Sequence, residues 1–276
     1  MDEKLAPGLY IVATPIGNLG DLSPRAAHVL SHADLLAVED SRVTGKLLHH
    51  LGVKRPMTPY HDHNAAEARP QLLERMRAGA VALVSDAGTP LVSDPGYKLV
   101  RDAHEAGIPV TAIPGPSAPV AALTLSGLPT DRFLFAGFLP AKPGAKSEAI
   151  AELGAVRATL LLFESGPRLG ATLAALADAL GAREAAVVRE ISKLHEEVAR
   201  GPLPELAARY ADAPPKGEIV LVVAPPGDAA PPAEADVDEL LRAALARLPV
   251  GKAASEVAAA TGLRRADLYA RALALR

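Results

Sequence analysis

The sequence has 276 residues, an apolar fraction of 49% and a formal net charge of −3, so it is long enough for two domains with a sizeable core. No apolar run reaches the length of a membrane span, and the charged start Met1-Asp2-Glu3-Lys4 is unlike a signal peptide. The absence of cysteine excludes disulfides, thiolate metal ligands and thiol nucleophiles, and a cytoplasmic protein fits best.

The first predicted strand is Leu9–Thr14, and the loop that follows it, PIGNLGD, contains two glycines. Ser23-Pro24 then predicts the start of a helix, with serine as the N-cap and proline at the first helical position. The loop lacks the GxGxxG spacing of dinucleotide-binding turns. A ligand-binding turn and a plain strand-to-helix turn therefore both remain open.

A second predicted strand, Leu35–Val38, ends in the polar sequence Glu39-Asp40-Ser41-Arg42. Ligands of open α/β sheets bind at the carboxyl ends of the strands, which makes Glu39 and Asp40 candidate site residues. Asp40 and Ser41 are equally good caps for a helix over Val43–His50. Both interpretations stay open.

The segment Thr58–Asn64 is a third polar edge and carries two histidines. Side chains two residues apart share one face of an extended chain, so His61 and His63 would point the same way. No third histidine or cysteine lies nearby to complete a zinc site. We expect exposed loop histidines and no bound metal.

The most informative stretch is the apolar strand Ala80–Val84 and the small-residue loop SDAGTP that follows it. Such a loop lets a ligand approach the main chain, and Asp86 adds one acceptor; the alternative is an ordinary connection. A helical stretch within Ala65–Ala78 precedes this strand and a helix over Tyr97–Ala106 follows it, and the strand Pro109–Ile113 ends in a second small-residue loop, PGPSA. The alternation of strands and helices predicts a doubly wound parallel sheet.

Gly127-Leu128-Pro129-Thr130 interrupts the pattern and suggests a boundary between domains at 1–127 and 128–224. A basic segment, Ala141–Ser147, is predicted as a flexible loop whose Lys142 and Lys146 either contact RNA or are simply solvated. The remaining predicted elements are the strands Arg132–Phe138, Ala158–Phe163, Ala185–Val188 and Ile219–Val223 and the helix Leu169–Leu180.

Residues 225–235 are rich in proline and alanine and indicate a linker to a helical tail, 236–276. The tail is predicted to form helices over Val237–Leu248, Ala253–Leu263, closed by Gly262, and Arg264–Leu275. From Arg242 to the end it has seven basic and two acidic residues, which favours attraction to phosphate. This arrangement is similar to a helix-turn-helix module, and a packing or dimer element is the alternative.

Five segments, TPIGNLGD, EDSR, YHDHN, SDAGTPLVSDPG and IPGPSA, closely resemble in this order the tetrapyrrole-methylase superfamily, and within it the ribosomal RNA small-subunit methyltransferase I family. FAGFLP, ESGPR, REISKLHEE and KGEIVLVV extend the resemblance over the second domain. The family usually reads Glu-Ser-Pro-X-Arg where this chain has Glu164-Ser165-Gly166-Pro167-Arg168, and has threonine where Ser41 and Ser192 stand. The resemblance implies two α/β lobes, with a parallel sheet first and a mixed sheet second.

The resemblance also implies transfer of a methyl group from S-adenosylmethionine (SAM) to the ribose 2′-hydroxyl of a cytidine in the decoding region. The implied partners are small-subunit ribosomal RNA or the assembled subunit, and a second copy of the chain. The cofactor contacts that it suggests are Pro15, Ser85, Asp86, Ala87, Gly88, Thr89, Ser117, Ala118, Phe163, Glu190, Gly217 and Glu218.

A ribose hydroxyl reacts poorly while protonated, so a general base within hydrogen-bond reach is needed. The candidates are Glu39, Asp40, His61 and Glu190, with Glu39 or Asp40 preferred. The candidate RNA contacts are Arg42, Lys142, Lys146, Arg168, Arg189, Arg264 and Arg265.

Two other functions compete with this one. A methyltransferase acting on a tetrapyrrole precursor has the same superfamily motifs, but a small acidic macrocycle needs no basic tail. A regulator that senses SAM and binds DNA through the tail belongs to a different class. A methylation assay and a DNA footprint separate the three.

Overall fold

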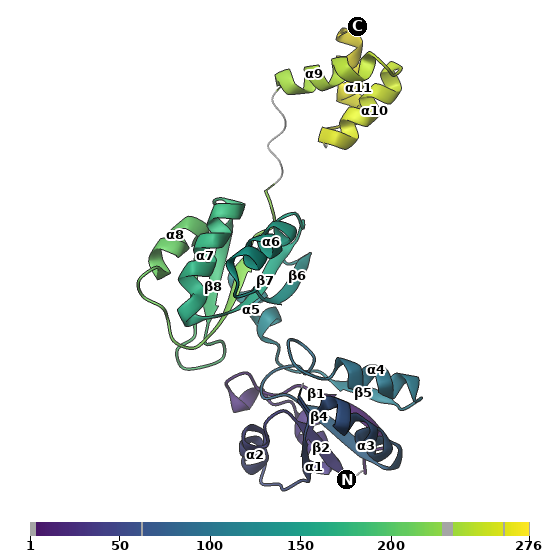
Figure 1. Ribbon diagram of the computed structural model, residues 1–276, viewed down its shortest axis with the longest axis vertical. Helices are drawn as coiled ribbons and strands as arrows, with labels where there is room; N and C mark the ends of the chain where they lie inside the picture. The colour runs from purple at the N-terminus through teal and green to yellow at the C-terminus, as the bar shows by residue number, and fades with distance from the viewer. Residues whose placement is uncertain (1–3, 62, 228–233, 262, 276) are drawn as a thin grey trace. The chain divides into compact units, whose positions relative to one another are not determined.

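The computed structural model describes residues 4–61, 63–227, 234–261 and 263–275. They form two compact units, residues 1–225 and 226–276, and the first unit contains two β-sheets with helices packed on both faces (Figure 1). The predicted fold class, an α/β protein with a parallel sheet, a mixed sheet and C-terminal helices, is confirmed.

The first sheet is entirely parallel, in the strand order β3-β2-β4-β1-β5. Its strands are β1 (Gly8–Val12), β2 (Leu35–Val38), β3 (Met57–Pro59), β4 (Ala80–Val84) and β5 (Val110–Ile113). All five residues of the central strand β4 are buried, as its continuous apolar sequence predicts. Because the strands are parallel, their carboxyl ends all lie at one edge of the sheet.

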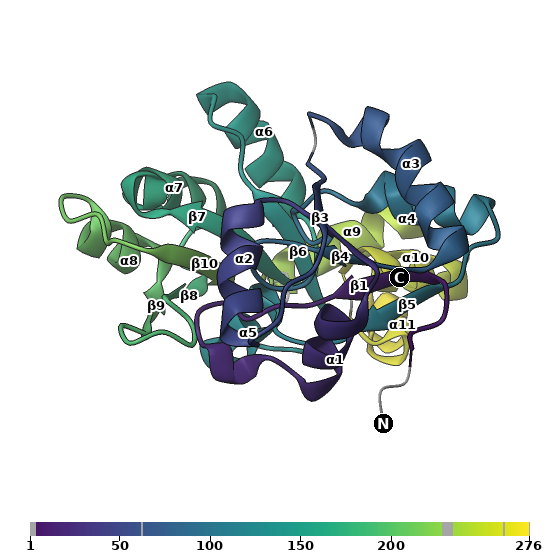
Figure 2. The same cartoon turned by 90° about the horizontal axis from the view of Figure 1, so that it is seen from below.

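Helices α1 (Pro24–His32) and α2 (Ser41–His50) cover one face of this sheet, and α3 (Ala65–Ala78) and α4 (Tyr97–Glu105) cover the other (Figure 2). The side chains of β4 alternate between the two cores: Ala82 and Val84 pack with α1 and α2, whereas Val81 and Leu83 pack with α3 and α4. A short 3₁₀ helix, η1 (Leu19–Asp21), precedes α1.

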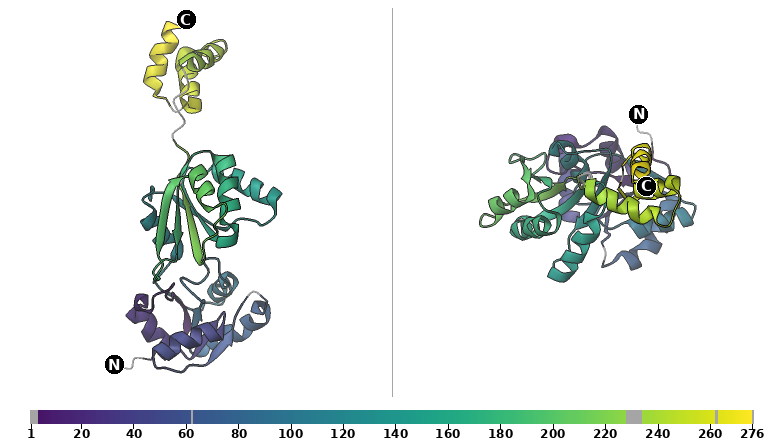
Figure 3. Two further views of the ribbon diagram at one scale, coloured as in Figure 1. Left: turned by 90° about the vertical axis from the view of Figure 1, so that its left-hand side faces the viewer. Right: turned by 90° about the horizontal axis from the view of Figure 1, so that it is seen from above.

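The second sheet is mixed, in the order β6-β7-β10-β8-β9. Several of its strands, coloured green, lie side by side in the left view of Figure 3. Its strands are β6 (Phe133–Phe138), β7 (Thr159–Ser165), β8 (Glu184–Arg189), β9 (Glu197–Pro202) and β10 (Glu218–Val223). Strands β6 and β7 are parallel, and the other neighbouring pairs are antiparallel.

Helices α6 (Pro143–Gly154), α7 (Gly166–Leu180) and α8 (Leu203–Tyr210) pack on one face of the second sheet. Helix α5 (Ala118–Ser126) directly follows the first sheet in sequence, yet its Ala122 and Leu123 pack into the other face of the second sheet. The helix therefore joins the two lobes within one compact unit.

One prediction about the second lobe is wrong. Residues 141–147 are not a flexible loop, because α6 begins at Pro143 and Lys142 is its N-cap residue. Proline lacks only an N–H that the first turn of a helix leaves unpaired, so it starts a helix as readily as it ends one. Helices α5 and α8 and strand β9 were not predicted.

The second unit consists of α9 (Glu234–Leu245), α10 (Val250–Thr261) and α11 (Arg265–Ala274) around an apolar core that includes Leu241, Val257 and Leu268. The predicted closing residue of the middle helix, Gly262, lies outside the described residues. Among the described residues, no helix is both long enough and apolar enough to cross a membrane.

Candidate functional site

A cavity of about 380 Å³ lies where the loops of the first sheet face the second sheet. Its size is that of a small-molecule site. The first lobe contributes Ile16, Ala87, Gly88, Thr89, Val92, Ser93, Asp94, Ser117, Ala118 and Pro119. The second contributes Phe138, Phe163, Glu164, Ser165, Ile191, Gly217, Glu218, Ile219 and Val220. Most of the side chains are apolar or small, so a bound molecule can reach backbone groups from both lobes.

The loop after β4 is held in place by its neighbours. Gly88 and Thr14 exchange two backbone hydrogen bonds, of 2.9 and 3.1 Å, and Gly88 adopts a φ of 78° that glycine tolerates without strain. The hydroxyl of Thr89 donates to the carbonyl oxygen of Pro116 at 2.9 Å. The two small-residue loops predicted from the sequence are thus tied together at the rim of the cavity.

Asp86 connects two strand ends rather than lining the cavity. Its Oδ1 accepts a hydrogen bond from the backbone N–H of Asp40 at 3.0 Å. Partial burial raises the pKa of Asp86, and the nearby charge of Asp40 adds to the effect, while the hydrogen bond opposes it. The bond fixes the polar end of β2 against the loop whose next residues line the cavity.

In the described part of the chain, four non-glycine residues adopt left-handed backbone conformations, and all four lie in loops that contribute to the cavity. Leu91 and Ser93 have φ values of 73° and 64°, and Glu190 and Ser192 have values of 52° and 67°. Such conformations cost free energy and are concentrated at functional sites. The Ser192 hydroxyl also donates to the carboxylate of Asp21, which joins the second loop to the first lobe.

The structure brings together eight of the twelve predicted cofactor contacts. Those that line the cavity are Ala87, Gly88, Thr89, Ser117, Ala118, Phe163, Gly217 and Glu218. The other four, Pro15, Ser85, Asp86 and Glu190, are not among the lining residues.

Asp94 and Glu164 also line the cavity but were not predicted as site residues, although the sequence contains features that could have indicated both. Asp94 belongs to the quoted SDAGTPLVSDPG stretch, and Glu164 directly follows an apolar strand.

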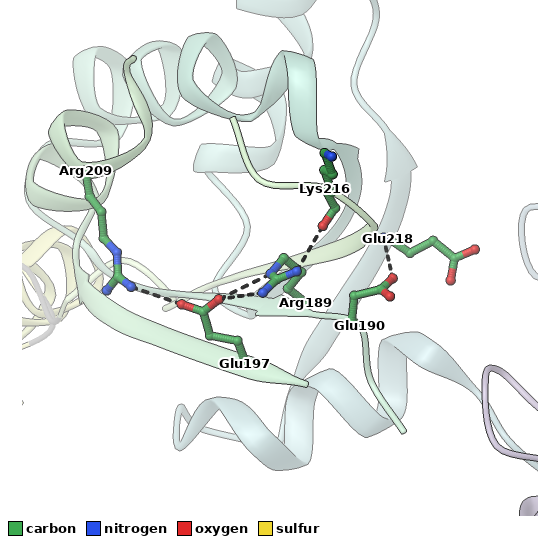
Figure 4. A network of polar contacts seen from close by, with 6 residues as sticks. All are labelled: Arg189, Glu190, Glu197, Arg209, Lys216 and Glu218. Carbon is green, nitrogen blue, oxygen red and sulfur yellow. Dashed lines mark hydrogen bonds and ion pairs between the residues drawn. The ribbon is translucent and has the colours of Figure 1, made fainter. Parts of the chain in front are cut away.

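Glu190 is held in a polar cluster on the second lobe (Figure 4). Its Oε1 accepts a hydrogen bond from the backbone N–H of Glu218 at 3.0 Å and one from Lys193 at 2.9 Å. Both interactions favour the ionised form and lower the pKa of Glu190. With one carboxylate oxygen committed in this way, Glu190 is a weaker candidate for a base than its sequence position suggested.

The other base candidates lie at the polar edge of the first sheet. Asp40 caps α2 by accepting from the N–H of Arg42 at 2.8 Å, and its hydrogen bonds to Arg42 lower its pKa to about 2. Glu39 is half-buried at the end of β2. The buried Nδ1 of His61 has no hydrogen-bond partner among the described residues, and no group of metal-ligating side chains occurs among them.

Four of the predicted RNA contacts in the first unit have protein partners. Lys146 donates to the hydroxyl of Thr172 at 3.3 Å, and Arg168 donates to the carbonyl of Leu139 at 2.7 Å. Arg189 pairs with Glu197 at 2.9 Å (Figure 4), and Arg42 pairs with Asp40 at 2.6 Å although its side chain is 87% exposed. Lys142 is exposed ahead of α6.

The net positive charge of the helical unit is smaller than the count from Arg242 onward suggested. Its first helix carries four acidic residues ahead of Arg242, so residues 234–276 contain seven basic and six acidic residues in all. Arg264 pairs with Asp267 at 2.8 Å, and Arg271 pairs with Asp238 at 2.6 Å. Arg265 is exposed at the start of α11. Any attraction to phosphate therefore depends on individual side chains and not on the net charge.

Residues 8–207 match the family described as Tetrapyrrole (Corrin/Porphyrin) Methylases, and residues 231–276 match the RsmI C-terminal HTH domain. A protein of Mesorhizobium japonicum named Ribosomal RNA small subunit methyltransferase I is 53% identical, covering 99% of this chain and 94% of its own length. A protein of the same name from Erythrobacter litoralis is 56% identical over 99% of this chain and 97% of its own.

Solved structures share the fold of the first unit. Uroporphyrin-III-C-methyltransferase from Thermus thermophilus covers 79% of this chain and 94% of its own, with a TM-score of 0.57 and 24% identity. Diphthine synthase covers 78% of this chain and 89% of its own, with a TM-score of 0.60 and 19% identity. The methyltransferase relatives confirm the predicted cofactor, SAM. The chain belongs to the ribosomal RNA small subunit methyltransferase I family of the tetrapyrrole methylases.

Proposed function

We propose that the protein transfers a methyl group from SAM to the ribose 2′-hydroxyl of a cytidine in the decoding region of small-subunit ribosomal RNA. The observation that carries the proposal is the sequence identity of 53–56%, over 99% of this chain, with relatives that are named as methyltransferases of this RNA. We expect the protein to act in the cytoplasm, as a homodimer, on free RNA or on the assembled small subunit.

The size and the lining of the cavity support binding of the methyl donor there. SAM supplies an electrophilic methyl group on a positively charged sulfur atom. The small-residue loops around Gly88 and Ser117 would hold the donor through main-chain groups, and Phe163 and Gly217 would hold it from the second lobe. Positioning of this kind lowers a barrier by about 7–11 kcal/mol in well-oriented cases.

The cationic side chains nearest to solvent would hold the RNA. Arg42, Lys142 and Arg265 are exposed, so they can approach phosphate groups without breaking buried contacts. The ion pair of Arg42 with Asp40 lies at the surface, where such pairs are weak and exchange readily for a phosphate.

The function is tested by incubating the protein with SAM and one of three substrates: small ribosomal subunits, the extracted RNA, or a tetrapyrrole precursor. Nucleoside mass spectrometry should find 2′-O-methylcytidine after incubation with one or both ribosomal substrates. Methylation of the tetrapyrrole alone would overturn the proposal. So would a sequence-specific DNA footprint of the full chain without any methyl transfer, because that is the behaviour of a regulator.

Of the base candidates, Glu39 is preferred over Asp40. A general base works best when its pKa is near the working pH, and the pKa of Asp40 is about 2. Glu39→Gln should lower kcat by about 10²–10⁴-fold with little change in the Kd of SAM. Asp40→Asn should lower kcat far less, because asparagine also caps a helix and the carboxylate that is lost is only a weak base.

The two variants serve as controls for each other, since each replaces a carboxylate by its amide in adjacent residues. Multiple-turnover kinetics with ribosomal subunits would measure kcat, and calorimetry would measure the Kd of SAM. If Glu39→Gln keeps full turnover, Glu39 is not the base.

A further inference from the structure

The cavity is lined by three carboxylates and, among the described residues, by no lysine, arginine or histidine. The carboxylates belong to Asp94 on the first lobe and to Glu164 and Glu218 on the second. Most of the remaining lining is apolar, which strengthens electrostatic interactions inside the cavity. A lining of this charge suits a ligand that carries a positive charge.

Two of the three carboxylates are compensated by the protein itself. Glu164 is almost fully buried and accepts hydrogen bonds from the hydroxyl of Thr172 at 2.7 Å and the backbone N–H of Ser165 at 2.8 Å, with Arg168 3.4 Å away. Glu218 is exposed and pairs with Lys193 at 2.8 Å. The charge of Glu164 is therefore offset by protein groups, and the charge of the exposed Glu218 is offset by solvent and by Lys193, which also pairs with Glu190.

Asp94 differs from the other two. It is half-buried and makes no ion pair with a lysine or arginine of the described chain. Burial raises the pKa of Asp94, and the neighbouring charge of Asp86 adds to this effect. A half-buried carboxylate without a cation costs free energy. Its neighbour Ser93 is in a left-handed conformation, so the chain keeps this residue in the cavity wall at a further cost.

We propose that Asp94 is the residue by which this cavity distinguishes the charged methyl donor from its uncharged product. The inference rests on the proposed function. The donor sulfur has three carbon substituents and a positive charge, whereas the sulfur of S-adenosylhomocysteine has two and none. The amino acid and nucleoside parts of the two molecules are the same. Asp94 therefore attracts the donor before transfer and loses that attraction after it, which favours exchange of product for fresh donor.

The test is the ratio of the two dissociation constants, measured by isothermal titration calorimetry on the full chain. Asp94→Asn keeps the size of the side chain and removes its charge. The Kd of SAM should rise about tenfold, as expected for the loss of one opposite charge in a partly desolvated site. The Kd of S-adenosylhomocysteine should change by less than about threefold, because no positive sulfur is involved.

Glu218→Gln is the matched control, because it makes the same chemical change in the same cavity lining. The side chain of Glu218 is exposed to solvent and pairs with Lys193, which weakens its effect on a charge in the cavity, so this variant should change the ratio much less than Asp94→Asn. A ratio that is unchanged in Asp94→Asn, or changed equally in both variants, overturns the assignment of Asp94.

If Asp94→Asn does not fold, the unaltered protein still decides the question. Sinefungin has a protonated amine near the position of the donor sulfur, so it should bind more tightly than S-adenosylhomocysteine. Equal binding of the two overturns the inference. If SAM itself does not bind to the unaltered protein, the proposed function fails. That result is distinct from an unchanged ratio in Asp94→Asn and from equal binding of sinefungin and S-adenosylhomocysteine.

Discussion

Replacing Ala87 by tryptophan should reduce the affinity for SAM by at least about 100-fold, which corresponds to about 2.7 kcal/mol. Ala87 is exposed in the loop after β4 and lines the cavity of about 380 Å³. An indole group at this position would occupy much of the space into which the donor must fit. Because the residue is not packed in a core, the fold should be unaffected.

Ala141→Trp is the control for this variant, since Ala141 is also an exposed loop alanine but does not line the cavity. Calorimetry should give a Kd for SAM close to that of the parent protein. Thermal melting should show that both variants are folded. Undiminished binding of SAM by a folded Ala87→Trp protein would place the donor elsewhere.

Replacing Gly166 by alanine should destabilise the protein by about 3 kcal/mol, the range of an overpacked core. Gly166 is buried at the first position of α7, and a Cβ added there would lie 1.8 Å from the carbonyl oxygen of Pro215. The carbonyl oxygen belongs to the backbone and the Cβ is bonded directly to it, so no side-chain rotation relieves the clash.

Gly45→Ala is the matched control, because Gly45 lies inside α2 with no atom within 4 Å of an added Cβ. It should raise stability by about 0.8 kcal/mol through helix propensity. Melting temperatures would measure both changes.

The Gly166→Ala variant should also bind SAM more weakly, since Pro215 is two residues before Gly217 in the cavity lining. An unchanged melting temperature for Gly166→Ala would mean that the Pro215 segment moves freely.

The first lobe could be predicted closely because its patterns are local. Strands β2 and β4 begin and end at the predicted residues, where apolar runs meet polar or glycine residues, and α3 lies in the stretch within which a helix was expected. Helix α6 could not be predicted in the same way, because residues 141–147 are small and basic like a flexible loop, and a Pro-Gly pair occurs in loops as well as at a helix start. Strand β9 contains glycine and proline, which are rare within strands.

The candidate site could be predicted only in part, for a physical reason. The loops that follow β4 and β5 carry their own signal, since small residues after a buried strand indicate ligand access. The facing wall comes from segments about 20 to 130 residues further on, and sequence alone does not show which of their side chains point inward. The hydrogen bonds that hold Glu190 and Arg189 away from new partners are also properties of the folded chain.

Helix α5 has a consequence for how the protein unfolds. Its first residue borders the cavity at the rim of the first sheet, and its middle fills the core of the second. Loss of either core therefore removes support from the other, which makes the two lobes a single cooperative unit. Residues 1–225 should absorb heat in one transition, and the three-helix unit, which has its own core, should melt independently of them.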